Sequence, residues 1–246
     1  AANSVEFGPV SIAAGNLNVD AVGTITQSGV MSVGGNSIFD NEDGSNGAIT
    51  LTNGSNVFTG TVTFRTDSGS DVSITDTTAL DLVALTANSL TASAGGALTD
   101  SGTLAISGLA DLTGGTITIN NTFDAGSLTF NSAGAVTISE NSATALSGTS
   151  TALSLDLDST GAISDDGTAD VTVTNLADFA GTSVTVDDTM NFGSLTFNSA
   201  GAVVVAEDSA TALSGTSTAL SLDLDSTGAI SDDGTADVTV TNLADF

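Results

Sequence analysis

The sequence predicts an all-β protein of the right-handed parallel β-helix, or β-solenoid, class, in which successive coils of the chain stack on one another. Three observations lead to this prediction: a 67-residue repeat, a shorter rhythm marked by glycine, and short runs in which apolar and polar residues alternate. Together they are typical of solenoids, because a single coil cannot bury its apolar side chains and needs neighbours to cover them.

The long repeat is exact over much of the chain. Residues 142–179 recur without a change at 209–246, which sets the 67-residue period, and shorter matches with the same period begin near residue 109. We therefore predict one continuous solenoid over 1–246, made of diverged coils at 1–108, repeat units at 109–175 and 176–242, and the start of a next unit at 243–246.

A shorter rhythm subdivides the repeat. Glycine followed by a small and then an aliphatic residue marks this rhythm, as at Gly134, Gly161 and Gly201. Counted from Gly114, the glycines at 134, 161 and 181 follow at separations of 20, 27 and 20 in the numbering. Similar marks continue upstream, at Gly23, Gly47, Gly69 and Gly96. If each mark begins a coil, the repeat consists of three coils whose lengths range from 20 to 27.

Between the glycine marks, short runs have the period of two that indicates β-strands. Examples are 116–119, 153–157 and 171–174, in which Leu, Ile and Val alternate with Thr, Ser and Asp. No long stripe with helical period is present, and the abundance of glycine disfavours helix. A tandem of β-sandwich domains fits less well, because the repeat unit is short for such a domain and the internal rhythm would have no explanation.

The charge of the chain limits its partners. Twenty-nine acidic residues face one basic residue, Arg65, for a formal net charge of -28. Such a chain is repelled by phosphate backbones and anionic headgroups, so we expect no nucleic acid partner. No apolar run reaches the roughly 18 residues of a membrane span, so we expect no membrane insertion. Salt or divalent cations relieve the self-repulsion, which favours an extracellular setting.

Several runs of the chain carry a family resemblance: 23–29, 56–62, 74–80, 89–92 and 96–102. They resemble the repeat regions of large bacterial filamentous-haemagglutinin-like surface proteins, and the resemblance covers nearly the whole chain. It implies a right-handed parallel β-helix at the bacterial cell surface or matrix, with a role in adhesion. The family's secretion domain carries Asn-Pro motifs, whereas the one proline here is Pro9 in Gly-Pro-Val.

The residue types available argue against catalysis. His, Cys and Lys are absent, and these residues supply most nucleophiles and general bases at neutral pH. Some parallel β-helices are polysaccharide hydrolases that use acidic pairs, for which Asp165-Asp166 and Asp232-Asp233 would be the candidates. Those enzymes also use a histidine and a basic group that holds the substrate, and one arginine cannot supply both. We therefore expect no catalytic residues and no enzyme.

Calcium is the one cofactor that the pattern favours, although none is required. The run 156–161 places oxygen-bearing residues first, third and fifth and glycine sixth, as at the start of a calcium loop, and 223–228 repeats it. The twelfth residue is Gly167 and not the glutamate of a full loop, so an outward strand face is the competing interpretation. The candidate ligands are Asp156, Asp158, Asp165, Asp166, Asp223, Asp225, Asp232 and Asp233.

These features predict a structural or adhesive protein that forms a rod, stalk or filament outside the bacterial cell. Neither terminus shows a capping pattern, so we expect self-association by head-to-tail or lateral stacking, with carbohydrate or a host surface as further partners. The alternatives are a solenoid that binds cations, carbohydrate or ice, and, with less support, a polysaccharide hydrolase.

Overall fold

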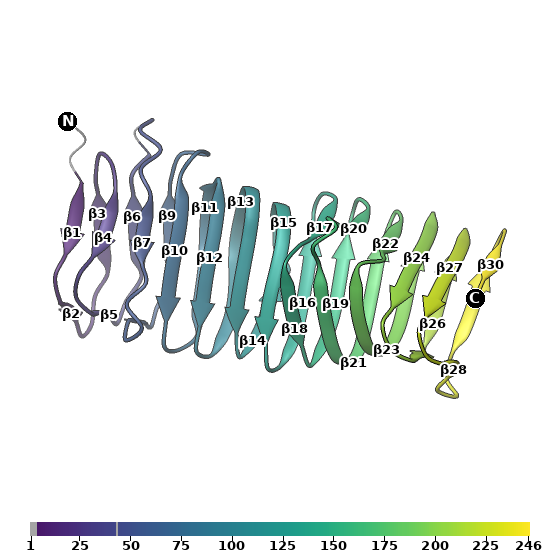
Figure 1. Ribbon diagram of the computed structural model, residues 1–246. Helices are drawn as coiled ribbons and strands as arrows, with labels where there is room; N and C mark the ends of the chain where they lie inside the picture. The colour runs from purple at the N-terminus through teal and green to yellow at the C-terminus, as the bar shows by residue number, and fades with distance from the viewer. Residues whose placement is uncertain (1–3, 43) are drawn as a thin grey trace. The chain divides into compact units, whose positions relative to one another are not determined.

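The computed structural model describes residues 4–42 and 44–246, and these residues contain strands and no helix. No helix of the described part could therefore cross a membrane. Every strand pair whose register is resolved is parallel and joins one coil to the next, as the stacked coils of Figure 1 show within each unit. The β-solenoid prediction is confirmed. The chain divides into two compact units, 1–126 and 127–246, which we describe in turn.

The first unit contains the diverged coils. Its strands are β1 (Val5–Phe7), β2 (Val10–Ile12), β3 (Leu17–Asp20), β4 (Ile25–Gln27), β5 (Met31–Val33), β6 (Ser37–Asp40), β7 (Ile49–Leu51), β8 (Val57–Phe58), β9 (Val62–Arg65), β10 (Asp71–Asp76), β11 (Leu80–Ala87), β12 (Ser89–Ala94), β13 (Ala97–Gly114) and β14 (Thr116–Ile119). Strand β15 (Phe123–Ser132) begins in this unit and ends in the second.

The second unit contains the exact repeat. Its strands are β16 (Ala135–Glu140), β17 (Thr144–Leu146), β18 (Thr149–Ala152), β19 (Ser154–Ser159), β20 (Ile163–Asp165), β21 (Asp170–Gly181), β22 (Val184–Val186), β23 (Thr189–Ser199), β24 (Ala202–Glu207), β25 (Thr211–Leu213), β26 (Thr216–Ala219), β27 (Ser221–Ser226), β28 (Ile230–Asp232), β29 (Asp237–Val240) and β30 (Ala244–Asp245).

The register of the strands gives the coil length directly. In the second unit, a short coil separates the paired residues Leu195 and Leu213, and a longer one separates Leu155 and Ala177. In the first unit the widest steps of this kind join Ser37 to Val62 and Ser32 to Val57. The coils of the repeat are thus shorter than the glycine rhythm predicts, and the expected three coils per repeat must be corrected to about three and a half.

The glycine rhythm misleads because the marker glycines do not occupy equivalent places in successive coils. The coil that follows Gly134 places Leu153 beside it, since the Leu153 N–H donates to the Gly134 carbonyl at 3.0 Å. Gly161 lies beside Ser142 instead, to whose carbonyl its N–H donates at 3.0 Å. The distance between two marks along the sequence is therefore not one turn of the solenoid.

The core consists of the inward side chains of each coil. Strands such as β16 and β24 alternate between buried and accessible positions, and the buried ones are mainly Val, Ile, Leu and Phe. Phe39 and Phe64 stack with ring centroids 5.8 Å apart in the first unit, and Phe179 lies 5.6 Å from Phe192 in the second. Burying each such side chain contributes about 1.5–3 kcal/mol, so the fold rests on this thin apolar interior.

Buried carboxylates link neighbouring coils at places where a strand ends and the chain turns into the next strand. Glu207 is 2% exposed; its Oε1 accepts the Phe192 backbone N–H at 2.8 Å and its Oε2 accepts the Thr211 hydroxyl at 2.6 Å. Asp76, also 2% exposed, accepts the Phe58 N–H at 2.9 Å in the same manner. A buried carboxylate is tolerated here because backbone and hydroxyl donors compensate its desolvation.

Candidate functional site

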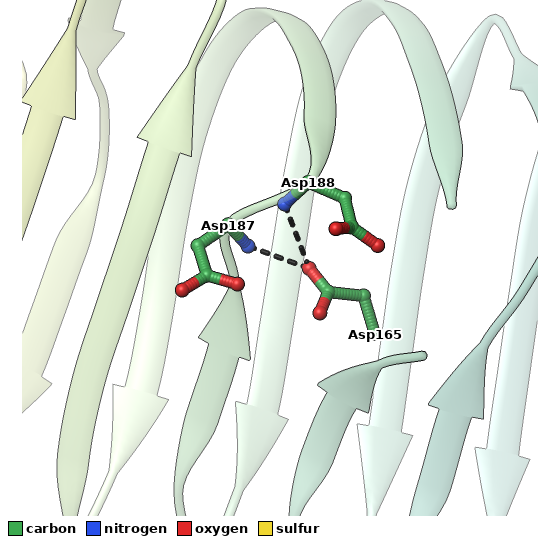
Figure 2. Close-up of side chains that lie close together, drawn as sticks. All are labelled: Asp165, Asp187 and Asp188. Atoms are coloured by element: carbon green, nitrogen blue, oxygen red, sulfur yellow. Dashed lines mark hydrogen bonds between the residues drawn. The ribbon is translucent and has the colours of Figure 1, made fainter. Parts of the chain in front are cut away.

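The tightest group of carboxylates in the described part of the chain is the Asp165 cluster, formed by Asp165, Asp187 and Asp188 (Figure 2). Asp165 ends β20, and the other two lie in the turn between β22 and β23, one coil further on. One carboxylate oxygen from each residue lies within 4.8 Å of the others. The Asp165 Oδ2 accepts the backbone N–H groups of Asp187 at 2.6 Å and Asp188 at 2.9 Å.

In the Asp165 cluster, burial and the charges of neighbouring carboxylates act on the pKa of Asp165. Partial burial raises the pKa of Asp165, the two backbone N–H bonds oppose that effect, and the charges of Asp188 and Asp187 add to it. Hard oxygen ligands of this kind suit Ca²⁺ or Mg²⁺. The cluster is therefore the arrangement in the described residues that could hold a divalent cation.

Asp165 also has a structural role that requires no cation. In the first unit, Asp100 accepts the backbone N–H groups of Asn120 at 3.0 Å and Asn121 at 3.1 Å, so the same turn forms where amides replace the two aspartates. Asp232, the copy of Asp165 in the next repeat, accepts two N–H groups of its own turn. A carboxylate at this position thus serves to satisfy turn amides.

A second group, the Asp178 ladder, consists of Asp156, Asp158 and Asp178. Asp156 and Asp158 are exposed on β19, and Asp156 is in register with Asp178 on β21. Burial, followed by the charges of Asp156 and Asp158, raises the pKa of Asp178, whose Oδ1 is buried without a hydrogen-bond partner. Burial and the Asp158 charge likewise raise the pKa of Asp156.

The run 156–161, considered above as the start of a calcium loop, is the end of a strand followed by a tight turn. Ser159 closes that turn, since its hydroxyl donates to the Ser142 carbonyl and accepts the Gly161 N–H at 3.2 Å. The repeated pair Asp223 and Asp225 lies outward on β27 in the same way, with Asp223 in register with Asp245. These aspartates therefore form rows across coils and do not surround one point.

Asp166 and Asp233, also candidates from the sequence, are engaged within their own turns. The Asp166 Oδ1 accepts the Thr168 N–H at 2.9 Å and its hydroxyl at 2.6 Å. Asp233 makes the equivalent pair of bonds to Thr235, which hold its pKa below the ordinary value. Both aspartates thus have a local structural role that would have to be interrupted for them to bind a cation.

Sequence reasoning missed Asp178, Asp187 and Asp188, which complete the two groups. Each lies in a different coil from the candidates it joins, so no local motif contains it. The available signal was the coil register, because Asp178 follows Asp156, and Asp187 follows Asp165, at the same separation along the chain.

Three shallow grooves of the first unit lie between neighbouring coils. Their walls are mainly hydroxyl, apolar and backbone groups, and each contains a single acidic residue: Asp124, Asp81 and Glu42 respectively. The groove with Glu42 also contains Phe64 and Arg65. A glycosidase needs two carboxylates across its substrate. None of these three grooves supplies such a pair, so they give no support to a hydrolase.

The stacked parallel coils and outward polar rows define the class of this protein, a β-solenoid repeat protein. The chain belongs to the family described as "Repeats of unknown function (DUF5649)", which matches residues 1–65 and 69–131. The second matched segment begins about one 67-residue period after the first. No curated protein and no solved structure matches the chain.

Proposed function

We propose that the chain is an extracellular structural or adhesive repeat protein that contributes a rod, stalk or filament body at the bacterial surface or matrix. The observation that carries this proposal is how its residues are used. Inward positions hold a slender apolar core, outward positions hold hydroxyls and carboxylates, and the chain contains no His, Cys or Lys. Such a chain can stack its coils and expose hydroxyls and carboxylates at its surface. It lacks the side chains that most acid–base and nucleophilic mechanisms use.

The setting and partners belong to the same proposal. The acidic composition and the resemblance to filamentous-haemagglutinin-like repeats favour the outside of a bacterial cell. Self-association by head-to-tail or lateral stacking would extend the structure, and carbohydrate or a host surface would be its target. No enzymatic activity is part of the proposal.

Electron microscopy of the purified chain in negative stain tests the structural role. We expect elongated particles that join end to end or side by side as protein and salt concentrations rise, because screening removes the repulsion between acidic copies. Compact particles that remain monomeric at every concentration would contradict self-association. Glycan-array binding tests the adhesive role separately, and a chain that retains no glycan would limit the proposal to a structural one.

Cation binding is a second candidate, favoured by the Asp165 cluster. Its test is the melting temperature in CaCl₂, MgCl₂ and NaCl at equal ionic strength. We expect a rise specific to Ca²⁺ that is lost in the double variant Asp187→Asn with Asp188→Asn and retained in Asp208→Asn, an exposed aspartate outside the cluster. Equal effects of all three salts would show screening alone and overturn the specific site.

A further inference from the structure

The sequence contains two Asn-Gly pairs, Asn46-Gly47 and Asn53-Gly54, and the fold holds them differently. The first pair lies between β6 and β7 and the second between β7 and β8, so both belong to the first unit. An asparagine before glycine is prone to deamidation, because glycine has no side chain to hinder attack by its own backbone nitrogen. Which pair reacts in the folded chain therefore depends on how each asparagine is held.

The reaction needs only the chain itself and water. The backbone nitrogen of the glycine forms a bond to Cγ of the asparagine, the Cγ–Nδ2 bond breaks, and the glycine N–H proton leaves with Nδ2 as ammonia. Water then opens the five-membered imide. Opening at Cγ gives aspartate, whereas opening at the main-chain carbonyl gives isoaspartate, in which the backbone continues through the side chain.

At Asn46 neither reacting group is engaged. The Asn46 side chain is exposed, and it makes no hydrogen bond within residues 4–42 and 44–246. The bond that Asn46 does make comes from its backbone, whose N–H donates to Asp67 Oδ2 at 3.4 Å. The Gly47 N–H has no acceptor in the same described residues. Both atoms that must join are thus available.

The backbone at Asn46 favours movement of this residue over movement of Gly47. Asn46 has a φ of 53°, the left-handed region that costs a residue with a side chain some free energy. Gly47 is buried, and the buried Asn41 amide donates to its carbonyl at 2.5 Å and to that of Gly23 at 3.0 Å. Asn46 can therefore leave a strained conformation and turn toward a nitrogen that is held in place.

Asn53, by contrast, is fixed on three sides by hydrogen bonds. Its Oδ1 accepts the Ser55 N–H at 3.0 Å, its carbonyl accepts the Asn56 N–H at 3.1 Å, and its own N–H donates to Gln27 Oε1 at 3.3 Å. Gln27 and the buried Asn56 are themselves joined by two side-chain bonds, of 2.9 and 2.8 Å. Ring closure at Asn53 would have to break this turn.

We propose that Asn46-Gly47 is a self-modification site, at which the folded chain converts Asn46 to aspartate or isoaspartate without an enzyme, while Asn53-Gly54 is protected. The product adds a negative charge next to Asp67, whose Oδ2 accepts the N–H groups of Gly44 at 2.7 Å and of Asn46. Because the change is irreversible, it records the age of the chain. This inference does not depend on the structural or adhesive role proposed above.

The test follows both pairs in the same sample. The purified chain is incubated in mildly alkaline buffer and digested with chymotrypsin, which cleaves after Phe39, Leu51 and Phe58 and so places the two pairs in separate peptides, 40–51 and 52–58. Mass spectrometry measures the exchange of the amide NH₂ for OH, and fragmentation identifies the residue. Digestion in water labelled with heavy oxygen marks any reaction that occurs after the incubation.

We expect Asn46 to react at least about tenfold faster than Asn53 in the folded chain, the factor that the net strength of the turn's hydrogen bonds supplies. In guanidinium chloride, where the turn is lost, the two rates should become similar because both asparagines precede glycine. A ratio that is the same in the folded and unfolded chains would overturn the proposal. So would an Asn46 that reacts only after unfolding.

Two variants assign the signal. Asn46→Gly removes the reactive amide and suits the positive φ, so the product in peptide 40–51 should disappear. Asn53→Ser keeps an oxygen that can accept the Ser55 N–H, and it should leave the rate at Asn46 unchanged. Circular dichroism verifies that both variants are folded. A product that persists in peptide 40–51 of Asn46→Gly would place the reaction elsewhere and contradict the assignment.

Discussion

Glu207 illustrates how a single side chain can link neighbouring coils in this protein. Its carboxylate is buried, yet it is shared between a backbone N–H of the preceding coil and hydroxyls of the following turn, from Ser209 and Thr211. Hydrogen bonds to a charged acceptor are stronger than neutral ones, and leaving their donors unpaired inside the fold is costly. Such a residue connects neighbouring coils beyond the backbone ladder.

We expect Glu207→Ala to lower the free energy of unfolding by about 1–3 kcal/mol, because the Phe192 N–H would remain buried without an acceptor. Glu207→Gln should cost less, since its amide oxygen can still accept that N–H. Urea denaturation followed by circular dichroism measures both. Asp208→Ala, at the exposed neighbouring position, is the control and should have little effect. A Glu207→Ala chain as stable as the parent would contradict the role of Glu207 in linking neighbouring coils.

Asp178 predicts a pH dependence of stability. Burial and the charges of Asp156 and Asp158 raise its pKa, so the folded chain binds this proton more tightly than the unfolded chain. Stability therefore falls as pH rises from the ordinary value of 3.8 through the raised pKa. Asp178→Asn removes the charge, and we expect it to raise the melting temperature near neutral pH, with a difference that shrinks as pH falls toward the ordinary pKa.

Scanning calorimetry across this pH range measures the effect of Asp178→Asn. The control is Asp245→Asn, which changes the same repeat position in the last coil, where the side chain is exposed. We expect the control to move the melting temperature little at any pH. A destabilising effect of Asp178→Asn at neutral pH would show that its carboxylate is stabilised by contacts and not strained by burial.

At the scale of strands, the exact repeat provides an internal comparison of the same sequence in two environments. Strand β21 is covered by β19 on one side and β23 on the other, and its Phe179 is fully buried. The copy of Phe179 is Phe246, which is 65% exposed because no coil of the described chain covers it. Burial here comes from the neighbouring coil and not from the sequence of the strand itself.

We therefore expect Phe179→Ala to cost about 3–5 kcal/mol of unfolding free energy, through lost apolar burial and a cavity beside Phe192. Phe246→Ala makes the same chemical change at the same repeat position and should cost less than about 0.5 kcal/mol. Chemical denaturation of both variants gives the comparison. Similar losses from the two substitutions would show that the last coil is packed as tightly as the interior ones.

At the scale of the whole molecule, the dominant quantity is the net charge of -28, with Arg65 as the single basic residue. Its contact with Asp40, at 3.5 Å between Arg65 Nη1 and Asp40 Oδ2, is exposed and contributes little. The remaining carboxylates repel one another, and this repulsion is stronger in the folded chain, where coils hold them in rows.

We expect the melting temperature to rise as ionic strength increases from about 10 mM to about 1 M, where the screening length falls from about 30 Å to about 3 Å. Sodium chloride and potassium chloride should act alike, since screening depends on ionic strength and not on the identity of a monovalent cation. Differential scanning fluorimetry with an extrinsic dye, required because the chain has no Trp or Tyr, measures this. A melting temperature that is constant or falls with salt would contradict the role of repulsion.

Much of the candidate site could not be predicted, for a reason visible in Asp165 and Asp187. The sequence marks Asp165 as a candidate, but Asp187 belongs to another coil and joins it through a turn whose length no local pattern reveals. Asp156 and Asp158 lie on the outward face of a strand, as the competing interpretation held, because alternation with Leu155 and Leu157 is local information.

The sequence by itself determined the solenoid class, the alternation of inward and outward residues, and the long period, because identity and period-two patterning are properties of linear order. Only the tertiary structure decided how many coils fill that period and which strands of successive coils pair. The physical reason is that residues in turns lengthen a coil along the sequence without forming strand pairs with the neighbouring coil. Strand register, set by backbone hydrogen bonding between coils, therefore decides that Val136 pairs with Leu155, whereas its repeat copy Val203 pairs with Val184.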